Sequence, residues 1–145
     1  YQLMSTADEA NSCLKAELGF LNISSIDGMI FDLGVSSMQF DLPEKGFSFM
    51  HNGPLDMRMD PNQELTAAEI VNTWSEAELG NIFRSYGEEK HWKQAARMIA
   101  QKRKEHPIHS THELANLLQP LARGKKKGIH PATLVFQALR ICVNN

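Results

Sequence analysis

The fold class is decided by the stretch Gly28-Met29-Ile30-Phe31-Asp32-Leu33-Gly34-Val35-Ser36-Ser37. Its apolar residues follow one another as they do in a strand that helices cover on both faces. The carboxylate of Asp32 is costly to bury at the end of such a strand unless it has a partner, and Gly34 permits a turn or a close backbone approach. Open α/β sheets bind ligands at the carboxyl ends of their strands. The pattern therefore indicates either an ordinary strand-to-loop turn, which the spacing alone favours, or a ligand site at Asp32.

Length and composition indicate one domain with a sizeable core. The chain has 145 residues, of which 42% are hydrophobic, and it contains neither an apolar run long enough to span a membrane nor a signal-peptide pattern. Its two cysteines, Cys13 and Cys142, lie in apolar helical patterns and are interpreted as buried free thiols in a reducing compartment. The sequence therefore predicts a protein of the cytoplasm or of an organelle matrix, with no membrane partner.

The charges are divided unevenly along the chain. The net charge is −2, but residues 1–89 carry four Lys/Arg against fifteen Asp/Glu, whereas residues 90–145 carry eleven against two. The first part thus stands at −11 and the second at +9. Such a split indicates either one face that meets a polyanion or two parts that neutralise each other across the fold.

Helix starts are legible because four segments have the capping-box pattern, a Ser or Thr followed three residues later by Glu. They begin at Thr6, Thr66, Ser75 and Ser110. Residues 34–65 hold repeated Gly and Pro without a helical period, which predicts a long ordered loop with a functional role. The predicted helices span about 6–18 (ended by Gly19), 67–73, 76–86, 88–104, 111–121 and the segment from Pro131 onward, the last apolar around most of its circumference and so buried on more than one side.

Five blocks of sequence gain a specific meaning when they are taken together. Along the chain they are Asp32-Leu33-Gly34-Val35-Ser36-Ser37-Met38-Gln39, Gly46-Phe47-Ser48-Phe49, Gly53-Pro54-Leu55-Asp56-Met57-Arg58-Met59-Asp60, Tyr86-Gly87-Glu88-Glu89, and His130-Pro131-Ala132-Thr133 leading to Phe136-Gln137-Ala138-Leu139-Arg140. In order and spacing they resemble the signature blocks of the RsmH (MraW) family over about residues 28–145. Members of that family are S-adenosylmethionine-dependent methyltransferases that modify the N4 amine of a cytidine in small-subunit ribosomal RNA.

The resemblance implies that the chain is the central portion of a longer enzyme and is inactive when isolated. The family's Gly-rich methionine-binding loop would precede residue 1, and its final strands would follow residue 145. The implied fold class is an α/β fragment with one clear strand, part of a Rossmann-like methyltransferase domain, plus an inserted mostly α-helical subdomain. Residues 1–40 would belong to the methyltransferase domain, residues 41–129 would form the inserted loop and helical substrate-recognition subdomain, and residues 130–145 would be a helix that returns to the methyltransferase domain.

The cofactor that the resemblance implies is S-adenosyl-L-methionine. Asp32, Gln39 and Tyr1 match family positions that contact it, and no catalytic residue is assigned. The exocyclic amine of cytosine is a poor nucleophile, so positioning and electrostatics are expected to supply most of the rate. Ser36 or Ser37 could offer further hydrogen-bond acceptors beside the Asp32 carboxylate.

The run from Leu55 to Asp60 alternates between apolar and charged residues with a period of two. In an extended segment the two kinds face opposite sides. The favoured interpretation is structural: Arg58 bridges Asp56 and Asp60, because arginine suits bidentate pairing with carboxylates, while the methionines pack on the core. The alternative is a loop that closes over the cofactor pocket.

Candidate phosphate contacts lie in the basic part of the chain. Basic runs are more often plain solvated surface, and it is the charge split and the family resemblance that favour contact with RNA. Trp92 and Phe136 are the aromatic residues of this part and both sit at core-like positions, so recognition of RNA backbone and shape is favoured over base stacking. The candidate RNA-binding residues are Lys102, Arg103, Lys104, Arg123, Lys125, Lys126 and Lys127.

No metal site is expected from the sequence. His106, His109 and His112 lie close together in the chain, but Pro107 interrupts a helix between them and Ser110 caps the next one. The three therefore lack the i, i+4 face of a zinc-binding helix, and they are interpreted as solvated or RNA-facing.

Three functional hypotheses follow. The first is a fragment of a ribosomal RNA cytidine N4-methyltransferase, which residues 32–39 favour. The second is a non-catalytic helical RNA-binding module that needs no cofactor. The third is a structural or partner-binding helical protein whose charge split is internal pairing. The expected partner under the first hypothesis is small-subunit ribosomal RNA or the subunit itself, and a homodimer is left open.

Overall fold

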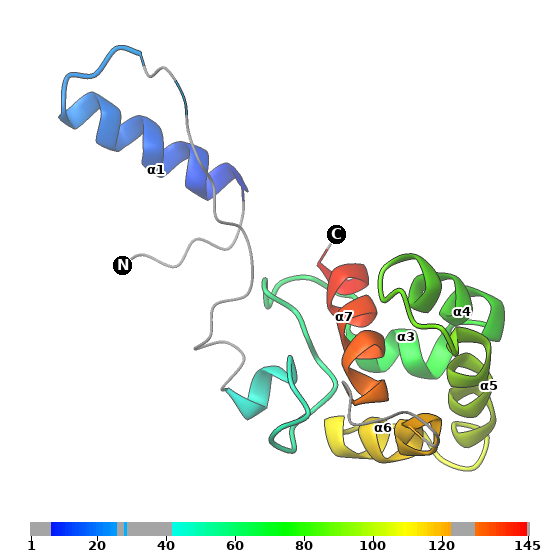
Figure 1. The fold of residues 1–145 in the computed structure, drawn as a ribbon. Coiled ribbons are helices and arrows are strands. Elements are labelled where there is room, and N and C mark those ends of the chain that lie inside the picture. The colour runs from blue at the N-terminus through cyan, green and yellow to red at the C-terminus, as the bar shows by residue number, and fades with distance from the viewer. Residues whose placement is uncertain (1–6, 26–27, 29–41, 123–129, 145) are drawn as a thin grey trace. The chain divides into compact units, whose positions relative to one another are not determined.

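The structure is a computed structural model that describes residues 7–25, 28, 42–122 and 130–144 (Figure 1). Contacts divide the chain into two compact units, Tyr1–Val35 and Ser36–Asn145. The described helix of the first unit is α1 (Ala7–Phe20). The described elements of the second unit are η1 (Pro43–Lys45), α3 (Ala67–Thr73), α4 (Glu76–Ser85), α5 (Trp92–Lys102), α6 (Thr111–Leu118), η2 (Gln119–Ala122) and α7 (Pro131–Val143).

Helix α1 is longer than its sequence pattern predicts. The predicted end was Gly19, but the helix continues through this residue to Phe20. It ends where Asn22 takes a left-handed φ of 55° and the amide of Ile23 donates to the carbonyl of Leu18 at 2.9 Å. Asparagine tolerates this conformation, which satisfies the last carbonyls of a helix.

Capping chemistry fixes the starts of three helices in the second unit. The Ser75 and Ser110 hydroxyls accept from the backbone of Glu78 and Glu113, whose carboxylates in turn accept from the capping residues' backbone, so both capping boxes are confirmed. Thr66 forms half of its box, since its side chain accepts from the Glu69 amide. The predicted box at Thr6 lies outside the described residues.

Helix α5 begins later than the sequence predicts. The predicted start at Glu88 is wrong, because Glu88 has a left-handed φ of 50° and the Glu89 amide donates to the carbonyl of Phe83. The carboxylate of Glu89 then accepts from the His91 amide at 2.8 Å. The Tyr86–Glu89 block is therefore a turn between α4 and α5. The predicted helix over 111–121 also changes character, since its last turn is the 3₁₀ helix η2, which contains Pro120.

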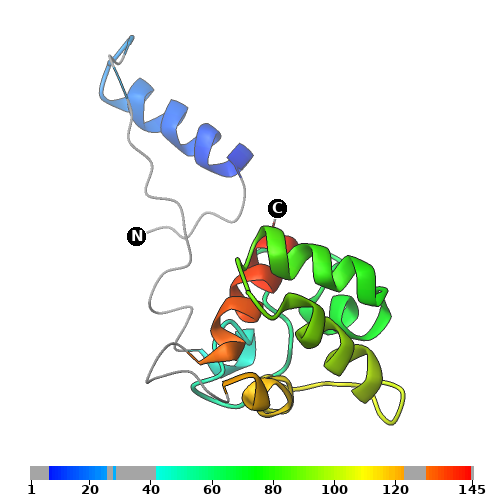
Figure 2. The same cartoon turned by 45° about the vertical axis from the view of Figure 1, so that its right-hand side comes forward.

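Helix α7 lies at the centre of the second unit and packs against α3, α4 and α6 (Figure 2). Its buried residues occur around much of its circumference, which confirms the expected burial on more than one side. The fully buried side chains of Phe47, Phe83 and Phe136 help to form the surrounding core. The helical subdomain is thus organised around a helix that comes last in the chain.

The predicted strand lies outside the described residues except for Gly28, so the structure describes the helical part of the expected α/β fragment. Among the described residues no strand forms. Their β-pairing consists of one isolated antiparallel bridge between Pro54 and Ser110. The described fold is therefore mostly helical, and the expected strand at residues 28–33 stays a prediction.

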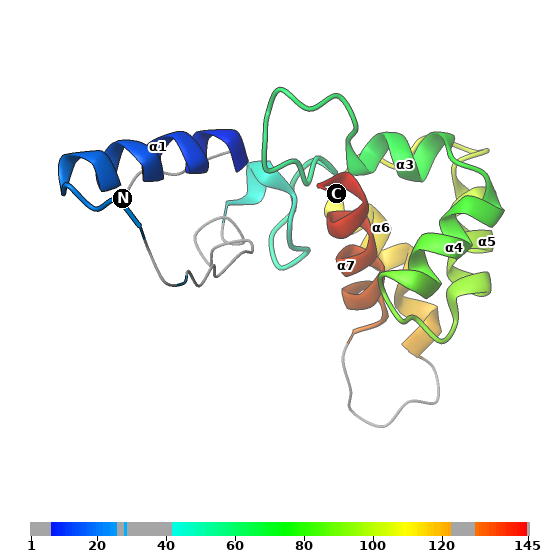
Figure 3. The ribbon, with the colours of Figure 1, turned by 90° about the horizontal axis from the view of Figure 1, so that it is seen from above.

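The described part of the predicted long loop, residues 42–65, is ordered against the helices (Figure 3). Two glycines allow its branches to touch. A Cβ atom on Gly53 would lie 1.8 Å from the carbonyl oxygen of Pro43, and one on Gly46, whose φ is +66°, would lie 1.9 Å from that of Pro54. No larger residue fits either position without moving the backbone.

None of the described helices is long and apolar enough to cross a membrane. Cys142 is a free thiol on α7 and is half-buried. Burial raises its pKa, so it stays protonated at neutral pH.

We expect Gly53→Ala to lower the free energy of unfolding of the second unit by about 1–3 kcal/mol, since overpacking against fixed backbone costs this much. Gly19→Ala is the matched control, because an added Cβ meets nothing within 4 Å there and alanine favours a helix interior. Denaturant unfolding of both variants measures the difference. An unchanged midpoint for Gly53→Ala would contradict the close approach of the loop branches.

Candidate functional site

The sequence-predicted site residues fall partly outside the described structure. Tyr1, Asp32 and Gln39, the candidate cofactor contacts, lie outside the described residues. So do Arg123 and the run 125–127 among the candidate RNA contacts. The described residues hold the loop that follows the predicted cofactor contacts, the end of α7, and the basic residues 102–104, and these define the geometry of the candidate site.

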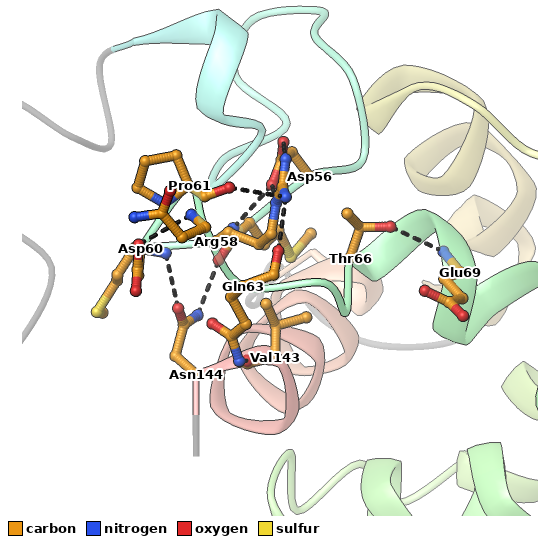
Figure 4. Close-up of polar contacts among 12 residues, drawn as sticks. Asp56, Arg58, Asp60, Pro61, Gln63, Thr66, Glu69, Val143 and Asn144 are labelled. Carbon is orange, nitrogen blue, oxygen red and sulfur yellow. Dashed lines mark hydrogen bonds and ion pairs between the residues drawn. The ribbon is translucent and has the colours of Figure 1, made fainter. Parts of the chain in front are cut away.

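An ion pair inside the loop fixes the Gly53–Asp60 block (Figure 4). The Nε of Arg58 donates to Oδ1 of Asp56 at 2.7 Å, and Nη2 donates to Oδ2 at 2.9 Å. Both side chains are about a quarter exposed. The hydrogen bonds from Arg58 lower the pKa of Asp56, and those to Asp56 raise the pKa of Arg58. Two parallel bonds of this kind hold orientation as well as charge.

The pairing of Arg58 differs from the predicted bridge between two carboxylates. Its Nη1 donates to the carbonyls of Pro61 and Gln63, at 3.1 and 2.6 Å, while the Asp60 carboxylate accepts from the Asn62 amide. Arg58 therefore bridges a carboxylate to the backbone of the following turn. The extended geometry assumed for the run is interrupted at Met57, whose φ is +64°, although its side chain is fully buried as predicted.

The C-terminal end of α7 holds the same loop by its last residues (Figure 4). The side chain of Asn144 accepts from the Met59 amide at 2.7 Å and donates to the Met57 carbonyl at 2.8 Å. The Gln63 side chain donates to the carbonyl of Val143. The sequence pattern did not indicate Asn144 as a residue that binds the loop. An Asn directly after the last apolar residue of a helix is a recognisable end signal, but it does not name the distant partner.

A second contact brings together two of the sequence blocks. Nη1 of Arg140 donates to the carbonyl of Phe47 at 2.8 Å, and desolvation lowers the pKa of this half-buried guanidinium. The ring of Phe49 lies 5.0 Å from each of the rings of His130 and Phe136. The Gly46–Phe49 and His130–Arg140 blocks, far apart in the chain, therefore form one cluster at the base of the loop.

Two of the candidate RNA contacts on the described surface also have partners in the fold. Lys102 pairs with Glu105 at 2.7 Å, which lowers the pKa of Glu105. Nη1 of Arg103 donates to the carbonyl of Val71 at 2.8 Å and so holds the end of α5 against α3. The side chain of Lys104 is exposed. The structure gives Arg103 a structural role in addition to its charge.

The two aromatic residues of the basic part behave differently. Phe136 is fully buried, as its pattern predicts. Trp92 is only half-buried, so the core-like position expected for it is wrong. Its indole packs against Gly80 of α4, where an added Cβ would lie 2.9 Å from two ring carbons. Because glycine presents no side chain, the ring lies on the surface of α4 and remains accessible.

The three neighbouring histidines lie on the surface of the second unit. His106, His109 and His112 are exposed, and the His109 amide donates to the carboxylate of Glu113 at 2.8 Å. This backbone hydrogen bond lowers the pKa of Glu113. Among the described residues, no group of three or more His, Cys, Asp or Glu side chains could hold a metal ion.

Comparison with known proteins gives this geometry its context. Residues 2–145 match the model of the MraW methylase family. The chain is also similar to the Ribosomal RNA small subunit methyltransferase H of Protochlamydia amoebophila (strain UWE25), with 64% identity over 107 residues, which are 73% of this chain and 34% of that protein. The chain thus spans about a third of the length of this relative.

We expect Asp56→Asn to destabilise the second unit by about 1 kcal/mol at pH 7, a figure that allows for solvent screening of a partly exposed pair. The pKa of Asp56 is lowered in the folded state, so its stabilising effect is complete above the unfolded pKa of about 4. That effect is lost as pH falls through the lower folded value. The stability difference between the parent and variant should therefore shrink below about pH 4.

Urea unfolding at several pH values measures this difference. Asp60→Asn is the matched control, because the Asp60 carboxylate accepts from the amide of nearby Asn62 and forms no hydrogen bond with Arg58. A stability difference for Asp56→Asn that does not change between pH 7 and pH 3 would contradict the ion pair.

Proposed function

The chain belongs to the MraW methylase family, and we propose that it is the central portion of an enzyme that methylates the N4 amine of a cytidine in small-subunit ribosomal RNA, with S-adenosyl-L-methionine as methyl donor. The observation that carries this proposal is the 64% identity to a ribosomal RNA small subunit methyltransferase. The charge division supports it, since a polyanionic substrate suits the part at +9.

The proposed division of labour follows the chain. Residues 1–40 belong to the methyltransferase domain and include the cofactor contacts, residues 41–129 recognise the substrate, and residues 130–145 return to the methyltransferase domain. The described contacts support this order. Arg140 of α7 and Asn144 just after it bind the loop that follows the proposed cofactor contacts along the chain. The described basic residues 102–104 lie on the same subdomain as that loop.

We assign the methyl donor to Asp32, Gln39 and Tyr1. The donor supplies an electrophilic methyl group on a sulfonium. Carboxylate and amide side chains suit its hydroxyl and amine donors, and an aromatic ring suits its adenine. The task left to the chain is to hold the N4 amine in line with that methyl and to accept hydrogen bonds from its N–H groups. Asp32, with Ser36 or Ser37, offers acceptors for this purpose.

The candidate RNA contacts act through charge. Lys102, Lys104 and the loop that carries Arg123 and residues 125–127 would neutralise phosphates without reading sequence. This enzyme would work in the cytoplasm or an organelle matrix on ribosomal RNA or the small subunit, and a homodimer stays open. The second candidate function, a non-catalytic RNA-binding module, is favoured by the mostly helical described fold. It predicts RNA binding with no methyl transfer by the longer protein.

In the longer enzyme, Asp32→Asn should lower the rate of methyl transfer by about 10²-fold or more, because the amide keeps the shape but loses the charge and one acceptor. Transfer of radiolabelled methyl groups to small-subunit RNA measures the rate. Glu44→Gln, a change to an exposed carboxylate, is the control and should leave the rate unchanged. Equal rates for the parent and Asp32→Asn would mean that Asp32 is only a turn residue. If the parent enzyme transfers no methyl group, the non-catalytic RNA-binding module is favoured instead.

Replacement of Lys125, Lys126 and Lys127 together by Ala should weaken RNA binding for all sequences alike. Each lost phosphate contact also lowers the slope of log affinity against log salt by about 0.7–0.9. Gel-shift titrations at two salt concentrations measure both effects. The control is the triple Lys→Arg variant, which keeps the charge and should keep the affinity. If the Ala variant binds RNA normally but melts earlier, the charge split is internal pairing, as the third hypothesis holds.

A further inference from the structure

A hollow lies between α4 and α5, which run side by side in the second unit (Figures 1 and 2). It has a volume of about 640 Å³. Its apolar lining comes from Ala77, Trp92 and Ala96, and its charged lining includes Glu76, Lys93 and Arg97. A pocket of this size suits a small ligand of one or two rings. The hollow lies outside the sequence blocks and is not used by the function proposed above.

Trp92 makes this hollow an aromatic surface. One edge of its indole rests on Gly80, where an added Cβ would lie 2.9 Å from Cε3 and Cζ3. This contact fixes the ring against α4 while the side chain stays half-exposed. A half-exposed indole held in this way offers a ring surface on which a nucleic-acid base can stack once the flexible side chains of Lys93 and Arg84, which lie over the ring, move aside.

Positive charge surrounds the indole. The Nζ of Lys93 lies 5.2 Å from the ring centroid and the Cζ of Arg84 lies 5.9 Å from it. Arg97 faces Glu76 across 3.9 Å, with 69% and 52% of the two side chains exposed. A long, solvent-exposed pair of this kind contributes little, so a phosphate can replace the Glu76 carboxylate beside Arg97. Two cations, Lys93 and Arg97, thus line the hollow with one carboxylate, and Arg84 adds a third cation beside the indole.

We propose that this Trp92 hollow binds an unpaired nucleotide of the RNA substrate. The base would lie against the indole and the two alanines, and its flanking phosphates would meet Lys93, Arg97 and Arg84. Stacking requires a base that is not held in a helix, which selects single-stranded RNA over duplex. The inference rests on the proposed function for the identity of the polyanion. It adds a base-stacking contact where the sequence favoured recognition of RNA backbone and shape.

Fluorescence of the 145-residue chain tests the proposal directly. The chain has two tryptophans, so Trp74→Phe leaves Trp92 as the only indole. We expect an eight-nucleotide oligocytidylate to quench its emission in a saturable manner, and an RNA duplex of equal length to quench it at least several-fold more weakly. Absence of quenching by the single strand, or equal quenching by the duplex, would overturn the proposal.

Charge variants supply the second measurement. In the same background, Arg84→Ala with Lys93→Ala and Arg97→Ala should weaken binding about tenfold or more at low salt and lower the salt slope by about 2, since each contact with a single strand contributes about 0.7. The matched control exchanges the three residues for Lys, Arg and Lys, which keeps the charge and should keep the affinity. All three side chains are exposed, so neither set disturbs the core. Unchanged binding by the Ala set would overturn the proposal.

Variants of Trp92 and an acidic competitor distinguish base stacking on the ring from binding of any acidic polymer. Trp92→Phe should retain binding measured by fluorescence anisotropy of labelled oligocytidylate, whereas Trp92→Leu should lose about tenfold. Circular dichroism checks that both variants fold. If Trp92→Leu does not fold, the charge variants test the proposal in its place. Competition by polyglutamate as strong as that by RNA would make the hollow a docking site for acidic protein and overturn the proposal.

These binding measurements need no methyl donor and no methyl transfer. Failure of the longer enzyme to methylate RNA would count against the proposed function, while loss of Trp92 quenching would count against the hollow. The two failures are therefore distinguishable.

Discussion

The described fold depends on one constraint: a long loop without regular secondary structure must find partners for its backbone amides and carbonyls. Buried backbone groups that lack hydrogen bonds are strongly destabilising. Between residues 42 and 65 these partners are a few backbone groups, such as the carbonyls of Lys45 and His109, together with polar side chains. Arg58 binds the carbonyls of Pro61 and Gln63, and Asn144 binds the backbone of Met57 and Met59. The order of the loop is therefore set by a few polar side chains and single backbone hydrogen bonds and not by a ladder of strands.

Helix α7 connects this loop to the helical subdomain. Its buried face packs against three helices, while Arg140 and Asn144 reach the loop from its C-terminal half. The loop follows the proposed cofactor contacts, and α7 is the helix proposed to return to the methyltransferase domain. A single packed helix thus joins the loop to the rest of the helical subdomain.

The sequence predicted what is local. Helix starts at Ser75 and Ser110 were predictable because a capping box is complete within four residues. The burial of α7 followed from its apolar circumference, and the pairing of Arg58 with Asp56 from their spacing. The late start of α5 was not predictable, because it depends on a left-handed Glu88, a conformation that glutamate seldom adopts.

Contacts between distant segments were beyond the sequence pattern. The alternation of apolar and charged residues from Leu55 to Asp60 does not indicate that the Met59 amide binds an Asn side chain 85 residues away. Trp92 was assigned to the core because its spacing is apolar, but Gly80 leaves room for it on the surface of α4. For the candidate site, the assignments of Asp32, Gln39 and Tyr1 to the cofactor stay predictions, as do the domain limits and the RNA contacts.

The distances along the chain between the partners of the loop have a consequence for its synthesis. The loop residues Phe47, Met57 and Met59 bind Arg140 and Asn144, which are 85 to 93 positions later. On a ribosome the loop is made first and must wait until the whole helical subdomain has emerged. Such nonlocal closure is slow relative to helix formation. The nascent chain therefore exposes this loop to chaperones and proteases for longer than any of the capped helices.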